Sequence, residues 1–571
     1  MTELLELVQN GKWEEAWKLA ENLKQAGEKS EEFMILYATI CAEQGTVQSE
    51  YEAIFRGLEN YPMNAELYFM LGNYYMGRQR SSLAYLCYEQ ANHYCQEPGD
   101  RQMIQESMQM AAGQPDFEVN EVSIVILAEQ NAEMLRDAVQ SIIEHEAGIS
   151  YEIIVVDNEC LGQSLEWLHE YEQIRVVTCC GKTGFAEGAN IGIKLAQIYN
   201  DIYLMSSDAV LLPNTLFWLR MGLYERETIG AAGGITNEGW PQQKSELSCQ
   251  TYEEYIAAAE RLNVPDDCVC ENRIWLDAFS LLLRRKAIDN TGLFEGRTAG
   301  QLYSVMDYGM KLVRANYETV LCHNSFIYRR RGENHAKEGD LEKFEAKWKF
   351  PVLYYSNSRS DLIGVIQRPR GEEIRVLEVG CGCGSTLSAI RYKYPNAHVY
   401  GIELMPEVAA GGKYMADIIV GDIETMEMPY EEHMFDYIMF GDVLEHLRDP
   451  KRVVENMKRY LRPGGRILAS IPNVMNIEVV VSLLKGDFTY RDHGLLDRTH
   501  IHLFTLREIG RMFQEAGYVI ENMWTSNWRE GILERNEENE RIIEALYRIE
   551  GIADQAEFEV YQYLVECAVC E

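Results

Sequence analysis

The sequence predicts a multidomain α/β protein that begins with helical repeats, and three observations carry this prediction. Residues near the N-terminus recur at an interval of 34, as Gly11 and Gly45 do, and as Tyr37 and Leu71 do. Two later regions each alternate short apolar runs with helix-like segments, and acidic residues follow several of those runs. The chain has 571 residues, a length that fits about three to four domains.

Composition and charge narrow the class of protein. The formal net charge of −37 argues against DNA, RNA or an anionic membrane as the main partner, because a negative surface repels phosphate. No apolar run reaches the roughly 18 residues that span a bilayer. The first residues lack the basic-then-apolar pattern of a signal peptide. The 14 cysteines are scattered rather than paired in a short framework, so we expect a cytoplasmic protein.

The repeats occupy residues 1–105. The clearest unit has small and aromatic residues at fixed places: Leu71, Gly72, Tyr75, Ala84, Tyr88, Ala91 and Pro98. This unit resembles the tetratricopeptide pattern, in which small residues let paired helices pack closely. About three helix pairs fit into the segment. Two interpretations remain open: a docking surface for a protein or peptide partner, or a spacer that packs on the next domain.

The second region covers residues 120–345. Its apolar run 122–127 predicts a strand, and a second run, 151–156, ends at Asp157. The segment 182–192, rich in glycine, follows, and the apolar run from Ile202 leads to Asp208.

This order resembles that of family 2 glycosyltransferases, which have the GT-A fold. The resemblance implies that Asp157 binds the base or ribose of a nucleotide sugar, with Gly184 and Asn190 in the same site. It also implies that Asp208 holds the divalent metal, Mg²⁺ or Mn²⁺, that neutralises the diphosphate leaving group.

The second region departs from that family at several positions. The tripeptide after the first strand is Ala128-Glu129-Gln130, and Ser206 stands where an acid or asparagine is usual before the metal ligand. The position expected to deprotonate the acceptor hydroxyl is Val305, which cannot take a proton. Asp307 is then the first candidate for the base. Transfer by another acid and binding without transfer are both open.

The third region covers residues 360–571 and contains the most informative motif. An apolar run, 374–377, leads into Glu378-Val-Gly-Cys-Gly-Cys-Gly384, and a helix-like segment follows. A strand, a tight turn and a helix start let the backbone approach a ligand closely. The glycines Gly380, Gly382 and Gly384 are spaced G-x-G-x-G, whereas dinucleotide loops read G-x-G-x-x-G.

Further motifs follow the glycine loop in order. Glu403 ends a second strand, Asp422 lies in Gly421-Asp-Ile-Glu424, and a fourth strand, 435–440, runs into Gly441-Asp442. Together they resemble class I S-adenosylmethionine (SAM) methyltransferases, which have a Rossmann-like seven-stranded sheet. The resemblance implies that Glu378 holds the methionine amino group and that Glu403 accepts the ribose hydroxyls. It assigns Asp422, Ile423 and Asp442 to the same cofactor site.

Two clusters are candidates for the acceptor side. Asp442-Val-Leu-Glu445-His446 resembles an arrangement that supports a divalent metal in ubiquinone-type O-methyltransferases. Asp442, Glu445 and His446 are therefore expected to bind Mg²⁺, or His446 to act as a base. The alternative is that Glu445 and His446 cap or orient the loop beneath SAM.

The second cluster places several histidines within residues 490–504. His493 and His500 are candidates for the base, and Arg498 for binding a phosphate or carboxylate of the acceptor. His502 is expected to face the core next to Phe504. The stretch resembles the acceptor loop of methyltransferases found beside glycan-assembly enzymes.

The predicted function is SAM-dependent methylation of a sugar hydroxyl, coupled to a nucleotide-sugar glycosyltransferase domain. The expected substrates are a nucleotide sugar and a glycan or glycoprotein acceptor, with a protein partner at the repeats. One alternative is a methyltransferase whose other two domains only bind and recruit the acceptor, which the replacement at Val305 favours. Another is a non-catalytic assembly factor, against which the intact Glu378, Glu403 and Asp422 speak.

Overall fold

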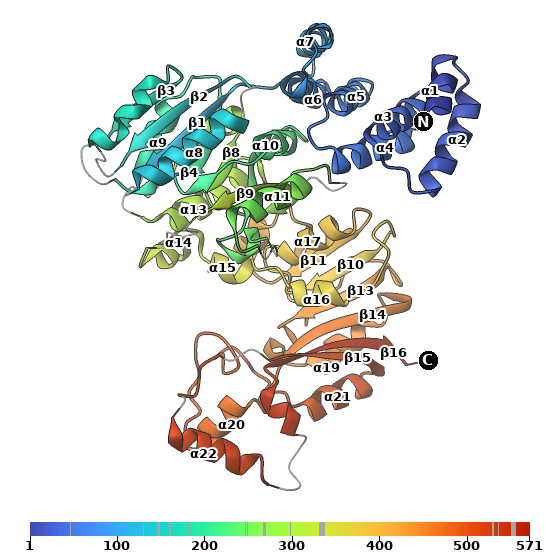
Figure 1. The fold of residues 1–571 in the computed structure, drawn as a ribbon. Coiled ribbons are helices and arrows are strands. Elements are labelled where there is room, and N and C mark those ends of the chain that lie inside the picture. Colours follow the sequence, from blue (N-terminus) through green and yellow to red (C-terminus); the bar gives the residue numbers. More distant parts are fainter. Residues whose placement is uncertain are drawn as a thin grey trace. The chain divides into compact units, whose positions relative to one another are not determined.

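A computed structural model describes the chain apart from residues 46, 129–130, 146–148, 159–161, 180–182, 246, 248, 267–269, 297–298, 331–336, 528–529, 535, 550–554 and 571. The departures at Glu129 and Gln130 lie outside the described residues. The chain divides into two compact units, Met1–Lys347 and Trp348–Glu571 (Figure 1). No described helix combines the length and the apolar character needed to cross a membrane.

Unit 1 begins with helices: α1 (Thr2–Gln9), α2 (Trp13–Gln25), α3 (Glu31–Glu43), α4 (Val47–Asn60), α5 (Ala65–Met76), α6 (Ser81–Tyr94) and α7 (Pro98–Ala112). Helices α2, α4 and α6 begin at residues 13, 47 and 81, which reproduces the 34-residue interval of the sequence. Gly72 shows why a small residue recurs there, because a Cβ at this position would lie 2.4 Å from the ring of Tyr88. These helices are compatible with tetratricopeptide-like repeats.

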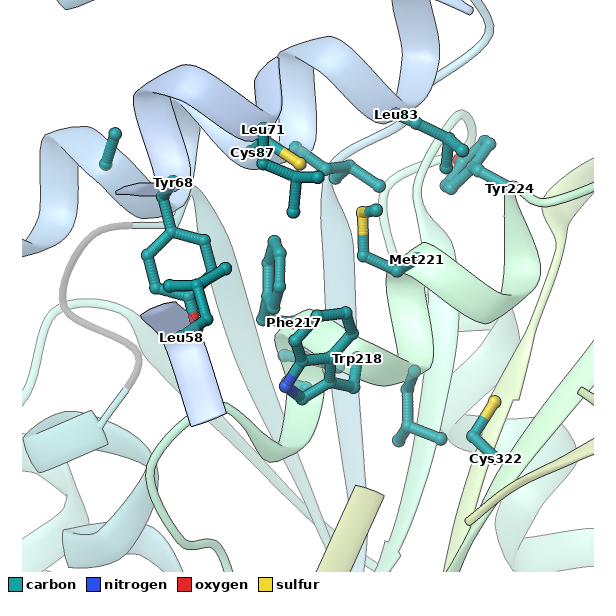
Figure 2. Packing of buried hydrophobic residues seen from close by; sticks show 14 of the residues in the cluster. Leu58, Tyr68, Leu71, Leu83, Cys87, Phe217, Trp218, Met221, Tyr224 and Cys322 are labelled. Atoms are coloured by element: carbon teal, nitrogen blue, oxygen red, sulfur yellow. The ribbon is translucent and has the colours of Figure 1, made fainter. Parts of the chain in front are cut away.

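The stack of helices packs on the α/β part of unit 1. Its helices share one hydrophobic core with α10 (Thr215–Leu223), and Figure 2 shows Tyr68 beside Phe217 within it. The two rings meet edge to face at 5.2 Å. Beside them Arg220 of α10 forms a buried ion pair with Glu89 of α6. This is the contact that the spacer interpretation expects, and docking of a partner stays a prediction.

The α/β part of unit 1 is a nine-stranded sheet with the path β3-β2-β1-β4-β8-β6-β9-β5 and with β7 paired to β9. Its strands are β1 (Val122–Ala128), β2 (Tyr151–Asp157), β3 (Ile174–Thr178), β4 (Asp201–Ser206), β5 (Ala209–Val210), β6 (Ile229–Thr236), β7 (Glu271–Arg273), β8 (Ser280–Leu283) and β9 (Glu318–Arg329). Its helices are α8 (Ala132–His145), η1 (Gly162–Glu170), α9 (Phe185–Leu195), α10, η2 (Pro241–Gln243), α11 (Tyr252–Leu262), α12 (Arg285–Thr291), α13 (Gln301–Arg314) and α14 (Asp340–Trp348). Strands β3, β2, β1 and β4 are parallel, as the GT-A resemblance implies.

Unit 2 is built on a seven-stranded sheet in the order β12-β11-β10-β13-β14-β16-β15. Its strands are β10 (Arg375–Val379), β11 (His398–Glu403), β12 (Asp417–Val420), β13 (Phe435–Gly441), β14 (Leu461–Pro472), β15 (Tyr518–Ser526) and β16 (Gln562–Val569). Its helices are α15 (Val352–Tyr355), α16 (Ser360–Val365), α17 (Ser385–Lys393), α18 (Pro406–Gly411), η3 (Leu444–His446), α19 (Pro450–Met457), α20 (Ile477–Leu484), α21 (Leu506–Glu515), α22 (Glu537–Leu546) and η4 (Gln555–Glu559).

Strand β16 is antiparallel to both neighbours, whereas the five strands from β12 to β14 are parallel. The predicted seven-stranded, Rossmann-like sheet is therefore confirmed. The chain order reverses at β10 and β13, and at such a point the carboxyl ends of parallel strands open a crevice for a ligand.

Candidate functional site

The glycine loop of unit 2 connects β10 to α17 in a conformation that favours glycine at three positions. Gly380, Gly382 and Gly384 have φ angles of +69°, +55° and +75°. A Cβ on Gly380 would also lie 2.5 Å from Val443, the second residue after β13. The loop is thus pressed against the end of the neighbouring strand, and a side chain at this position has no room.

Glu378 lies on β10, two residues before the first glycine of the loop. It is 3% exposed, and its Oε2 atom has no hydrogen-bond partner among the described residues. Burial raises the pKa of this carboxyl to about 8. A buried carboxylate oxygen without a partner fits the amino group that the resemblance assigns to it, because an ammonium would satisfy both its charge and its hydrogen bond.

The other two predicted cofactor acids follow the next two strands of the sheet. Glu403 at the end of β11 is buried, and its two oxygens accept backbone N–H groups of Gly382 and Met405, both at 2.9 Å. Asp422 follows β12, is exposed, and accepts the N–H of Glu424 at 2.9 Å. The structure therefore brings the three acids to consecutive strand ends, along which an extended cofactor can lie.

Asp442 follows β13 and is held by groups from two other segments. Its φ of +55° is unusual for a residue with a side chain. Its Oδ1 accepts the hydroxyl of Ser470 at 2.7 Å, and its Oδ2 pairs with Arg359 at 2.7 Å. Sequence reasoning missed Arg359, which lies before the first strand in no recognisable motif. Ser470 carried a weak signal, since it is a polar residue near the end of a buried strand.

Glu445, His446 and His500 form the one group of described His, Cys, Asp and Glu side chains with the spacing of a metal site. Their ligand atoms all lie within 4.8 Å of one another. Backbone bonds hold the two segments together, because the carbonyl of Glu445 accepts the N–H groups of Ile501 and His502. The structure thus joins the two clusters that the sequence predicted separately.

Glu445 is the buried member of this group. It is 1% exposed, and neither carboxyl oxygen has a hydrogen-bond partner among the described residues. Burial, and next the charge of Asp442, raise the pKa of this carboxyl well above its usual value. Such a group gains stability from a proton or a cation placed beside it.

Backbone carbonyls fix the orientation of both histidines. Nδ1 of His500 lies 3.2 Å from the carbonyl of Leu495, and Nδ1 of His446 lies 3.2 Å from that of Thr499. A carbonyl only accepts, so each Nδ1 is assigned the proton and each Nε2 keeps a lone pair. Burial, and next the neighbouring His446, lower the pKa of His500, which favours the neutral ring.

The side chains of His493, Arg498 and His502 are not members of this group. His493 is exposed, and Arg498 pairs with Asp492 at the surface. His502 bonds to the carbonyl of Arg448 at 3.3 Å and packs its ring 5.9 Å from that of Phe504. Of the two predicted bases in this stretch, the structure therefore places His500, and not His493, beside Glu445.

In unit 1, Asp157 and Asp208 lie at one edge of the sheet, because β2 and β4 both pair in parallel with β1. Asp157 is buried and accepts the hydroxyl of Thr178 at 3.4 Å. Asp208 pairs with the buried Arg329 of β9. Gly184 is the residue before α9, at the same end of the sheet as Asp157.

Two other predicted residues of unit 1 are engaged within the protein. The side-chain amide of Asn190 bonds to both the carbonyl and the N–H of Phe294, at 2.9 and 3.0 Å. Asp307 lies buried on α13 and forms an ion pair with Lys347 at 2.6 Å. Val305 is also buried on this helix.

Two family models match the chain. The one described as a methyltransferase domain matches residues 356–522, and the one described as glycosyl transferase family 2 matches residues 123–272. Each covers less than half of the chain.

Curated relatives match part of the chain. A demethylmenaquinone methyltransferase of Bacillus cytotoxicus is 26% identical over 163 residues, which are 25% of this chain and 69% of the relative. A ubiquinone biosynthesis O-methyltransferase of Xylella fastidiosa is 33% identical over 135 residues, 21% of this chain and 54% of the relative. The chain thus spans little more than half the length of the second relative.

Among solved structures, the likeness is weak. A complex of GalNAc-T7 with UDP, GalNAc and Mn²⁺ has a TM-score of 0.31 and 14% identity, covering 39% of this chain and 45% of that one. From its two matched segments, the chain is identified as one that joins a family 2 glycosyltransferase domain to a C-terminal SAM-dependent methyltransferase domain.

Proposed function

We propose that residues 360–571 transfer a methyl group from SAM to a sugar hydroxyl of a glycan or glycoprotein. The observation that carries this proposal is the group of Glu445, His446 and His500. Glu445 and His446 come shortly after β13 and directly follow the segment whose Val443 lies against Gly380 of the glycine loop. Residues that follow β13 lie at the carboxyl ends of the parallel strands, where the crevice for the cofactor opens, so a base or a metal there is placed to act on an acceptor. A glycosyltransferase domain in the same chain supports a sugar as the acceptor, by analogy.

The chain's own residues bind the cofactor and remove the acceptor proton. Glu378, Glu403 and Asp422 bind the amino group, the ribose and the adenine of SAM, which supplies an electrophilic methyl group on its sulfonium. Bound there, SAM would supply its methyl carbon to the acceptor oxygen, and its sulfur would keep the electron pair of the broken carbon–sulfur bond. The hydroxyl proton passes to Nε2 of His446 or His500, which the carbonyl bonds on Nδ1 keep unprotonated.

A divalent cation fits the same group of residues. Glu445 offers a buried carboxylate whose oxygens have no described hydrogen-bond partner, and the two histidines offer Nε2 lone pairs. As the alternative to a histidine base, these three residues would hold Mg²⁺ or Mn²⁺, which would act as a Lewis acid on the acceptor hydroxyl, and the proton would then leave to solvent. Asp442, assigned by the resemblance to the same metal, is instead paired with Arg359.

The glycosyltransferase domain, which we place at residues 120–345, is proposed to bind a nucleotide sugar and to handle the same acceptor. A second candidate function is recruitment without sugar transfer. It is favoured by Val305 at the position of the base and by the ion pair that holds the buried Asp307 to Lys347, which already occupies an oxygen of that carboxylate.

Calorimetry with SAM on the full chain tests the methyltransferase proposal. We expect binding by the unmutated protein and its loss in Gly382→Arg, whose side chain would collide with the carbonyl of Tyr355 and fill the loop. Gly486→Ala provides a control, because this glycine, which also has a positive φ, has open space around it. An unmutated, folded protein that does not bind SAM would contradict the proposal.

Mass spectrometry of cell-surface glycans then separates the two functions of the chain. A strain without the protein is complemented with Gly382→Arg or with Asp157→Ala. We expect the first variant to lose only a methyl group from the glycan and the second to lose a whole sugar. If Asp157→Ala leaves the glycan intact, the recruitment function is the better account of unit 1.

A further inference from the structure

The end of β4 carries an ion pair where the family resemblance predicts a metal. Asp208 accepts two contacts from the guanidinium of Arg329, with Nε at 3.3 Å from Oδ1 and Nη2 at 3.2 Å from Oδ2. Its Oδ1 also accepts the hydroxyl of Ser206. Both oxygens of the predicted metal ligand are therefore engaged by the protein, and the positive charge beside them belongs to an arginine.

Arg329 is fixed in this position. It is 1% exposed, and Asp208 is 9% exposed. The backbone of Arg329 exchanges two hydrogen bonds with the amide of Asn237, at 2.7 and 2.9 Å. Its guanidinium lies 5.3 Å from the centre of the Phe279 ring. A buried guanidinium cannot lose its proton and needs a carboxylate nearby, so it will not readily release Asp208.

The surroundings of Asp208 do not fit a divalent cation. A divalent cation needs several free ligand atoms, yet Ser206 replaces the second acid and both oxygens of Asp208 are engaged by Arg329. Among the described residues, the group with metal-site spacing lies at Glu445 and not here. A cation on Asp208 would also sit beside the guanidinium of Arg329, and the two like charges would repel in a region of low dielectric constant.

We propose that Arg329 takes the place of the metal ion, so that unit 1 binds a nucleoside diphosphate sugar without a divalent cation. This inference rests on the proposal that unit 1 binds a nucleotide sugar. Its physical basis is that Arg329 already neutralises Asp208, so the carboxylate does not repel a diphosphate. Asp208 and Arg329 are thus positioning residues of the site.

Calorimetry with nucleoside diphosphates tests the inference on the full chain. The probes are UDP, GDP, CDP, ADP and dTDP, each titrated with chelator and then with Mn²⁺. A Glu445→Gln background removes the candidate metal group of unit 2, so that any effect of Mn²⁺ reports on unit 1. We expect one of the probes to bind with the same affinity, within about twofold, in both buffers.

The two ways to fail are distinguishable. Binding that becomes at least tenfold tighter with Mn²⁺ would overturn the metal-free site while upholding the nucleotide site. Absence of binding by every probe in both buffers would overturn the nucleotide site and the inference with it.

A double-mutant cycle tests the pairing itself by thermal unfolding of the same protein. Arg329→Met and Asp208→Asn each leave a buried partner without its counter-charge, so each should lower the unfolding temperature. The double variant should recover a large part of the loss. Additive losses would show that Arg329 does not neutralise Asp208, and that result would also overturn the inference.

Discussion

At the scale of single residues, Glu378 is held at a cost to stability that SAM binding explains. Its folded pKa of about 8 lies above the ordinary 4.5, so the folded protein keeps a proton that the unfolded chain releases. The contribution of this group is therefore fully present below pH 4.5 and is lost as the pH rises to about 8. We predict that Glu378→Gln raises the unfolding temperature at pH 8 in the absence of SAM.

The same variant should weaken SAM binding by at least about tenfold, because an amide cannot balance the ammonium charge. Differential scanning calorimetry and isothermal titration measure the two effects, with roughly 2–4 °C expected for each kcal/mol gained. Glu373→Gln is the control, since that carboxyl is exposed and should change neither. A Glu378→Gln variant that is less stable at pH 8 would contradict the assigned role of burial.

His500 gives a second prediction at this scale. Burial and the neighbouring His446 lower its pKa, so Nε2 stays available at pH values where an ordinary histidine is protonated. We predict that His500→Gln weakens Mn²⁺ binding at least about tenfold, as loss of a ligand should. Electron paramagnetic resonance of bound Mn²⁺ measures this. His502→Asn, which removes a ring held by Arg448, should leave the affinity unchanged; equal losses in both variants would refute a specific site.

The sequence predicts site residues that lie within one continuous motif, and it does not predict contacts between residues that are far apart in the sequence. The spacing of the motif places Glu378 next to the glycine loop, because the strand, the turn and the helix follow one another directly in the sequence. Nothing local joins His500 to Glu445, or Arg329 to Asp208, since both pairs meet only when distant strands and loops are assembled. Charge replacement by Arg329 is therefore visible only in the structure.

At the scale of elements, the helix pairs depend on small residues at their contacts. Gly72 of α5 would place a Cβ 2.4 Å from the Tyr88 ring of α6. We predict that Gly72→Ala destabilises unit 1 by about 1–3 kcal/mol through overpacking. Chemical denaturation measures the change. Gly99→Ala in α7 has open space and should be neutral or stabilising by up to about 1 kcal/mol; a neutral Gly72→Ala would show that the helix pair adjusts freely.

The burial of the strands in the two sheets explains why the sequence predicts them. Strands β1 and β13 are buried along nearly their whole length, so they read as continuous apolar runs rather than as alternating ones. The polar residues that follow such runs, Asp157 and Asp442 among them, mark the carboxyl ends where the sites lie. Strand β15 is mostly exposed and lacks this signal.

At the scale of the whole molecule, the 34-residue interval predicts the helix pairs, but it does not predict that α10 packs on the last of them. In α6, Glu89 pairs with Arg220 of α10 and Gln90 donates to Asn214 at the start of α10, and both partners are more than a hundred residues away. The sequence does not show which residue pairs with Glu89, because Arg220 becomes its neighbour only in the folded chain. The sequence could therefore leave the spacer and docking interpretations open, and the packing shown in Figure 2 is what the structure adds.

This packing predicts how unit 1 responds to truncation. A fragment of residues 120–347 would remove Tyr68 from the Phe217 ring and leave the buried Arg220 without Glu89, whereas a fragment of residues 1–347 keeps these contacts. Removing one partner of a buried ion pair costs about 3–5 kcal/mol, and the apolar face adds to that loss. We therefore expect the shorter fragment to aggregate or unfold at a much lower temperature. Size-exclusion chromatography and thermal unfolding compare the two, and equal unfolding temperatures would show that the helices are a separable spacer whose contact with α10 contributes no stability.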